Sequence, residues 1–157
     1  MGTAIAKAQE NGNLHLEQEV QTLLANENFR IDNPDSHPIT LRHLITHQSG
    51  IDDSQAYLCS YYIDHGDGTH TKLVNLRDAG FCPESSPITL NGFLAAYLDN
   101  GGEFYNLEQN FTGQTPGQEY LYSNIGASLA GYAMKVATGF SLADYAQREI
   151  FTPPGHE

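Results

Sequence analysis

The chain has 157 residues, enough for one domain with a sizeable hydrophobic core. Its 19 acidic residues against 7 basic ones give a formal net charge of −12, which argues against binding to nucleic acid or to an anionic membrane surface. No apolar run approaches the roughly 18 residues of a membrane span, and the start lacks a signal-peptide pattern. We therefore expect either a cytoplasmic protein or a chain whose original start lies upstream.

Helical patterns dominate the first half of the chain. Residues 3–11 predict a first helix with a small apolar face, and Gly12 is a natural residue to follow its end. Residues 20–24 again show helical spacing of apolar side chains. Thr40 is suited to cap a short helix over residues 41–47, because its hydroxyl can accept a hydrogen bond from the first turn.

Residues 52–86 are different: they show weak periodicity and many Tyr, Asp, His and Gly residues. We interpret them as a long loop insertion, and loops of this length inside a compact domain are often functional. The segment contains both cysteines, Cys59 and Cys82, which are either two unpaired thiols or a disulfide. A disulfide would stabilise a loop of this size by about 3 kcal/mol and would imply an oxidising compartment.

The second half returns to helical patterns. Residues 90–98 carry an apolar stripe, and residues 123–138 predict a thin helix that is rich in Gly and Ala and capped by Ser123. Ser141 is suited to cap a last helix. The pattern therefore predicts a mostly α fold, with about six helices, long loops and almost no convincing strand, in one helical domain over residues 1–157.

Tyr122 and Asn124 are the strongest candidates for chemistry. They lie two positions apart, where a short extended segment meets the helix at 123–138. A phenol is a poor base in water, but a neighbouring ammonium favours its phenolate, which can accept a proton from a serine hydroxyl. An asparagine amide can both donate and accept hydrogen bonds. Local sequence alone equally allows a plain helix start, with Tyr122 as a packing residue.

Other polar patterns carry weaker signals. His65 and His70 have poor metal spacing on a Gly-rich loop, so we expect no metal and no cofactor. Helix-cap and loop hydrogen bonds explain His43 and His47 better than a ligand role does. Ser49 has no nucleophile elbow around it, and we interpret the acidic pairs as solvated charges, namely Asp52 with Asp53 and Glu17 with Glu19.

Four segments together resemble the serine β-lactamase-like family, which contains class C β-lactamases, D-Ala-D-Ala carboxypeptidases and related esterases. Residues 39–51 (ITLRHLITHQSGI) are similar to its "ITLRHLLTHTSGL" segment, and residues 116–124 (PGQEYLYSN) to its "PG…YSN" motif. Residues 141–153 (SLADYAQREIFTP) resemble "SFADYLRERIFEP", and residues 10–16 (ENGNLHL) resemble "EEGKLDL". The matches follow the family's order across nearly the whole chain.

The resemblance implies acyl transfer, in which the serine of a Ser-x-x-Lys motif attacks a carbonyl group. Tyr122 matches the family's general base, and Asn124 matches the amide that contacts substrate and lysine. The 157 residues contain no Ser-x-x-Lys and no Lys-Thr-Gly or His-x-Gly motif. We therefore interpret the chain as the helical, substrate-lid portion of a larger α/β serine hydrolase, without the flanking sheet elements and inactive alone.

Further expectations follow from this interpretation. The resemblance implies a small-molecule or peptide substrate and a periplasmic or secreted parent protein. The surface that the sheet would cover is then free for self-association. The alternative is a non-catalytic module that binds a peptide or glycan through residues 52–86, where Tyr57, Tyr61 and Tyr62 are concentrated.

Overall fold

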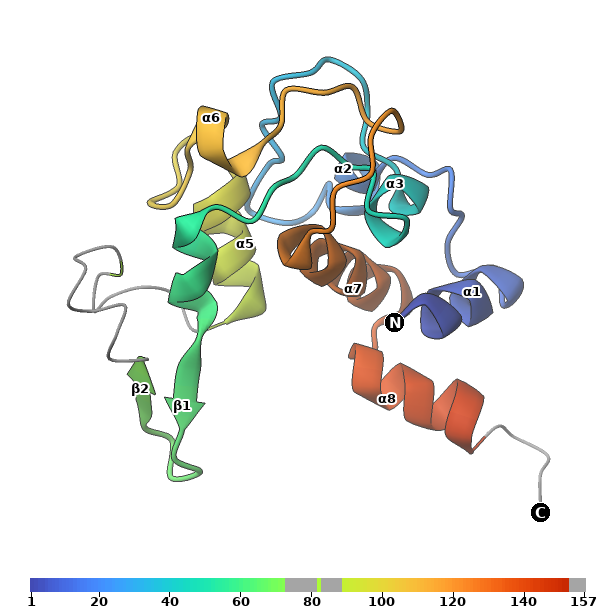
Figure 1. Cartoon of the computed structure of the whole chain (residues 1–157). Helices are drawn as coiled ribbons and strands as arrows, with labels where there is room; N and C mark the ends of the chain where they lie inside the picture. The colour runs from blue at the N-terminus through green and yellow to red at the C-terminus, as the bar shows by residue number, and fades with distance from the viewer. Residues whose placement is uncertain (73–81, 83–88, 153–157) are drawn as a thin grey trace.

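The structure is a computed structural model that describes residues 1–72, 82 and 89–152 (Figure 1). Its helices and strands, in chain order, are α1 (Gly2–Glu10), α2 (Val20–Leu23), α3 (Leu41–Ile45), the 3₁₀ helix η1 (Gln55–Ser60), β1 (Tyr62–Asp64), β2 (His70–Lys72), α5 (Leu90–Leu98), α6 (Leu107–Asn110), α7 (Asn124–Thr138), α8 (Leu142–Ala146) and the π-helical turn η2 (Gln147–Phe151). The mostly α prediction is confirmed. None of the described helices has the length and apolar character needed to cross a membrane.

Helix α7 lies at the centre of the fold, between α1 and α3 on one side and α5 on the other (Figure 1). Its small residues let these neighbours approach closely, and Ala130 and Ala133 are fully buried. The core around it is made of fully buried aliphatic and aromatic side chains, namely Ile5, Leu14, Leu24, Leu41, Leu44, Ile51, Leu94, Tyr97, Leu98, Ile125, Leu129 and Met134. Burial of this apolar surface is the main force that holds the short helices together.

The helix starts follow local capping chemistry. Thr40, Thr89, Ser123 and Ser141 each accept a hydrogen bond from a backbone N–H in the first turn of the helix that follows. The caps expected at Thr40, Ser123 and Ser141 are therefore confirmed. After α7 the chain turns at Gly139, whose φ of 77° lies in the left-handed region that favours glycine.

The segment 52–86 is more ordered at its start than the sequence suggested. Residues 55–60 form η1, and β1 pairs with β2 as an antiparallel hairpin in the register Tyr62 with Lys72 and Asp64 with His70. The hairpin extends away from the helices (Figure 1). A disulfide joins Cys59 in η1 to Cys82. The rest of the predicted insertion, residues 73–81 and 83–86, lies outside the described residues.

Helix α5 holds the start of that segment in place. The hydroxyl of the fully buried Tyr97 donates to the backbone oxygen of Asp52 at 2.9 Å and accepts from the backbone N–H of Ser54 at 2.7 Å. Burial raises the pKa of Tyr97, so the hydroxyl stays neutral and keeps its donor hydrogen. These two hydrogen bonds fix the backbone on both sides of Asp53.

Candidate active site

Tyr122 and Asn124 lie at the N-terminus of α7. The hydroxyl of Tyr122 donates to Oδ1 of Asn124 at 3.2 Å. The side chain of Tyr122 is 56% exposed, so it is not buried as a packing residue before the helix. Ser123, between them, is fully buried and caps α7 by accepting from the N–H of Gly126 at 2.8 Å. The motif is therefore both a helix cap and a pair of polar side chains that solvent can reach.

His47 joins the chain after α3 to this motif. Its backbone oxygen accepts from the N–H of Leu121 at 2.8 Å, and its Nδ1 accepts from the N–H of Ser123 at 3.2 Å. Its ring lies against the ring of Tyr122, with centroids 4.5 Å apart. Because Nδ1 accepts a hydrogen bond, the neutral imidazole carries its hydrogen on Nε2. His47 has a φ of 56°, in the left-handed region that residues other than glycine adopt uncommonly.

His43, one turn earlier, supports the same junction. Its Nδ1 accepts from the N–H of Thr40 at 3.2 Å, which completes the cap of α3. Gly117 packs over its ring so closely that a Cβ at residue 117 would lie 3.1 Å from Nε2 of His43. Partial burial lowers the pKa of His43, which favours the neutral ring. The structure thus confirms that His43 and His47 serve cap and loop hydrogen bonds.

Asp53 is the residue whose role the sequence interpretation missed. Its Oδ1 accepts from the hydroxyl of Ser123 at 3.1 Å and from the N–H of Ile125 at 3.0 Å. Its Oδ2 accepts from the backbone N–H of Asn124 at 2.8 Å and from the side-chain Nδ2 of Asn124 at 2.7 Å. The interpretation of Asp53 as a solvated charge is therefore wrong, because the fold brings its carboxylate to the positive end of α7.

Tyr57 of η1 and Tyr61, the residue that follows η1, lie beside this junction. The hydroxyls of Tyr57 and Tyr61 are 2.6 Å apart. Burial raises the pKa of Tyr57, and the Tyr61 hydrogen bond and the nearby Asp53 and Tyr122 raise it further, so Tyr57 is a neutral hydrogen-bonding group at physiological pH. Tyr62, in β1, contacts the ring of His70 edge-on instead. Binding of a peptide or glycan through residues 52–86 stays a prediction, since much of that segment lies outside the described residues.

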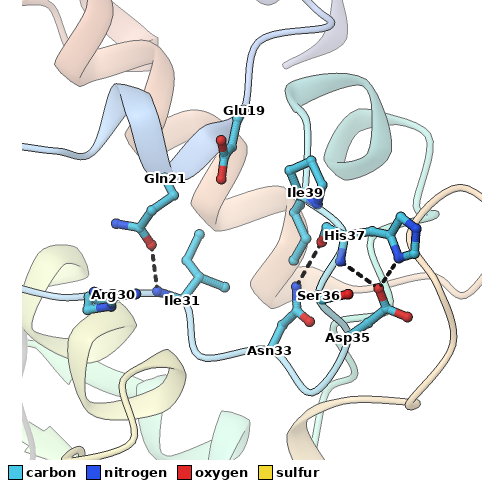
Figure 2. Close-up of a pocket in the computed structure, with 10 residues that line it drawn as sticks. Glu19, Gln21, Arg30, Ile31, Asn33, Asp35, Ser36, His37 and Ile39 are labelled. Atoms are coloured by element: carbon cyan, nitrogen blue, oxygen red, sulfur yellow. Dashed lines mark hydrogen bonds and ion pairs between the residues drawn. The ribbon is translucent and has the colours of Figure 1, made fainter.

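A separate polar hollow of about 150 Å³ lies between the segments at residues 19–21 and 30–39 (Figure 2). Asp35 makes the most side-chain hydrogen bonds among the described residues drawn there. Its carboxylate accepts from the backbone N–H of His37 at 2.7 Å and from the hydroxyl of Thr115 at 2.8 Å, and Nδ1 of His37 lies 2.6 Å from Oδ1 of Asp35. These hydrogen bonds lower the pKa of Asp35. The carboxylate thus holds its own loop together and joins it to the segment that contains Thr115. Across the described ranges, no three His, Cys, Asp or Glu side chains are grouped so that they could hold a metal ion.

Comparison with known proteins decides the family. The family model described as Beta-lactamase matches residues 1–157. The chain belongs to the Beta-lactamase family. The resemblance seen in the sequence motifs is therefore confirmed, and the mostly α structure is consistent with a fragment of the β-lactamase-like fold.

Two relatives show how this family member compares in length. It is 24% identical over 117 residues to Penicillin-binding protein 4* of Bacillus subtilis (strain 168), a match that covers 74% of this chain and 20% of that protein. It is also similar to the structure of the octameric penicillin-binding protein homologue from Pyrococcus abyssi, with a TM-score of 0.61 and 26% identity over 94% of this chain and 27% of that one. The chain thus spans about a fifth of the curated relative it matches.

Proposed function

We propose that residues 1–157 form the helical side of the active site of a serine hydrolase that transfers acyl groups from a β-lactam, a D-Ala peptide or an ester. The observation that carries this proposal is the pair of Tyr122 and Asn124, which are accessible and 3.2 Å apart at the start of α7. Family membership and the similarity to penicillin-binding proteins support it.

In the proposed reaction, Tyr122 is the general base. The oxygen of Tyr122 and Oδ1 of Asn124 are two acceptors close enough for one lysine ammonium to bridge. The ammonium favours the phenolate form of Tyr122, which then accepts the proton of a serine hydroxyl while the serine oxygen attacks the substrate carbonyl carbon. The bond from that carbon to the leaving nitrogen or oxygen then breaks, and the leaving group takes the proton from Tyr122, which gives the acylated serine. Asn124 has two amide hydrogens, and Asp53 accepts from Nδ2, so one hydrogen remains for a substrate oxygen.

The serine and the lysine of this mechanism are proposed to come from polypeptide outside these residues, since the 157 residues contain no Ser-x-x-Lys motif. Incubation of the 157-residue chain with fluorescent penicillin is therefore expected to give no covalent adduct in gel fluorescence or intact-mass spectrometry, because no activated nucleophile is present. The positive control joins residues 1–157 to the sheet segments of a β-lactamase-family enzyme that carry Ser-x-x-Lys and Lys-Thr-Gly; we call this protein the joined enzyme.

A stoichiometric penicillin adduct on the 157-residue chain alone would overturn the division of the site between two stretches of polypeptide. A joined enzyme that folds, keeps its serine accessible and still shows neither an adduct nor turnover of nitrocefin, a D-Ala-D-Ala peptide or a p-nitrophenyl ester would overturn the proposed function itself. The ratio of the three turnover rates identifies the substrate class.

We also propose that the chain self-associates through an apolar surface formed by α1, α7 and α8. Two adjoining hollows of about 580 and 350 Å³ share Met1 and Leu142, and Phe151 at the edge is 73% exposed. Exposed apolar surface of this kind is typical of an interface. The relative from Pyrococcus abyssi is itself described as octameric.

Sedimentation velocity tests this second proposal. We expect the 157-residue chain to sediment as a dimer or larger species at high concentration, and the Leu142→Glu variant to shift toward the monomer because it places a charge in the apolar surface. Glu103→Gln, at an exposed position outside α1, α7 and α8, serves as the control. A chain that remains strictly monomeric at high concentration would contradict the proposal.

A further inference from the structure

We propose that Asp53 is a positioning residue that sets the orientation of the Asn124 amide and, through it, of the Tyr122 hydroxyl. This inference rests on the proposed function of Tyr122 and Asn124. It concerns a residue that reaches the motif from 71 positions earlier in the chain, in the segment between α3 and η1. Four hydrogen bonds to the carboxylate of Asp53 support it.

The carboxylate of Asp53 has no free lone pair with which to act as a base or a metal ligand. A carboxylate offers about four lone-pair sites, and the hydroxyl of Ser123, the N–H groups of Asn124 and Ile125 and the Nδ2 of Asn124 occupy all four at 2.7–3.1 Å. A general base or a metal ligand needs a free lone pair. Asp53 therefore acts through the groups that it holds.

The amide of Asn124 is the group that this arrangement controls. An ionised carboxylate accepts hydrogen bonds only, so Nδ2 of Asn124 must face Asp53, and Oδ1 must face away from it. The reversed amide would set Oδ1 against a negative oxygen and lose the bond. With Nδ2 held by Asp53, Oδ1 is presented to the hydroxyl of Tyr122 at 3.2 Å.

Asp53 is more than a second helix cap. Ser123 already accepts from the N–H of Gly126, which is the ordinary capping bond of α7. A capping carboxylate needs only the backbone N–H groups, whereas Asp53 also binds the side chain of Asn124 and the hydroxyl of Ser123. Since Tyr97 holds the backbone on both sides of Asp53, the carboxylate is itself well placed to impose this geometry.

Nuclear magnetic resonance of the 157-residue chain tests the inference without any catalysis. In the parent chain, the Asn124 side-chain amide proton that bonds Asp53 is expected to exchange with solvent at least about tenfold more slowly than in Asp53→Ala, because a charge-assisted hydrogen bond is lost in the variant. The ring signals of Tyr122 are expected to shift in the same variant. Asp52→Asn is the matched control: among the described residues, Oδ1 of Asp52 accepts from the N–H of Asp53, and an asparagine oxygen can still accept that bond.

The inference would be overturned by a folded Asp53→Ala chain, with unchanged helical circular dichroism, in which that Asn124 amide proton exchanges as slowly as in the parent chain. Where Asp53→Ala does not fold, Asp53→Asn takes its place. Its single oxygen can accept only part of the four bonds, so we expect exchange rates between those of the parent chain and of free asparagine. Parent-like exchange in that variant is the contradicting outcome.

The joined enzyme supplies a second measurement, which distinguishes positioning through Asn124 from a purely structural role of Asp53. Asp53→Ala is expected to lower kcat at least about tenfold when Asn124 is present and to have little further effect in an Asn124→Ala background, because both changes remove the same interaction. Additive losses would contradict positioning through Asn124. If the joined enzyme shows no activity at all, the proposed function fails, while the exchange experiment on the 157-residue chain still decides the role of Asp53.

Discussion

Tyr122→Phe is expected to lower kcat of the joined enzyme by about 10²- to 10⁴-fold, measured with whichever of nitrocefin, a D-Ala-D-Ala peptide or a p-nitrophenyl ester it turns over best. The substitution removes a single oxygen atom. That oxygen is the proton acceptor of the proposed mechanism, and no other described side chain occupies its place beside Oδ1 of Asn124. KM is expected to change much less than kcat, because the lost interaction belongs to the transition state.

The effect can be separated from damage to the fold. The ring of Tyr122 stays in place against His47 in the Phe variant, and the hydroxyl is exposed, so we expect the melting temperature to change little. Tyr120→Phe is the matched control, because Tyr120 is 68% exposed and contacts His47 only edge-on. If the two variants are equally active, Tyr122 is not the general base.

Removal of the disulfide between Cys59 and Cys82 is expected to have the largest effect on stability. The bridge closes a loop with a sequence separation of 23, and loop-closure entropy assigns about 3 kcal/mol to a loop of this size. For a chain of this length, that loss corresponds to a melting temperature lower by roughly 6–12 °C. Thermal unfolding of Cys59→Ala/Cys82→Ala, followed by circular dichroism, measures it.

Reduction offers the matched control for this second experiment. Dithiothreitol is expected to lower the melting temperature of the parent chain to nearly that of the double variant and to leave the double variant unchanged. A parent chain that melts at the same temperature with and without reductant would show that the bridge contributes no stability. Cys59 lies in the same 3₁₀ helix as Tyr57, so ring signals of that tyrosine report whether the loss spreads toward the candidate site.

The helix starts could be predicted from the sequence because capping is local. Thr40, Ser123 and Ser141 bond to backbone groups three positions later, so the pattern and the contact lie in one short stretch. The sequence did not indicate two of the described helices, α6 and η1. Helix α6 is only four residues long, and η1 is a 3₁₀ helix. Neither contains enough apolar residues at α-helical spacing to predict a helix.

The sequence by itself determined the family, the mostly α character and the pairing of Tyr122 with Asn124 at the start of a helix, because these depend on residues close together in the chain or on motifs in a given order. Only the tertiary structure decided that Asp53 holds Asn124 and that His47 lies against Tyr122. Those contacts join residues 71 and 75 positions apart. They exist because burial of the core around α7 brings the two segments together, which no local pattern encodes.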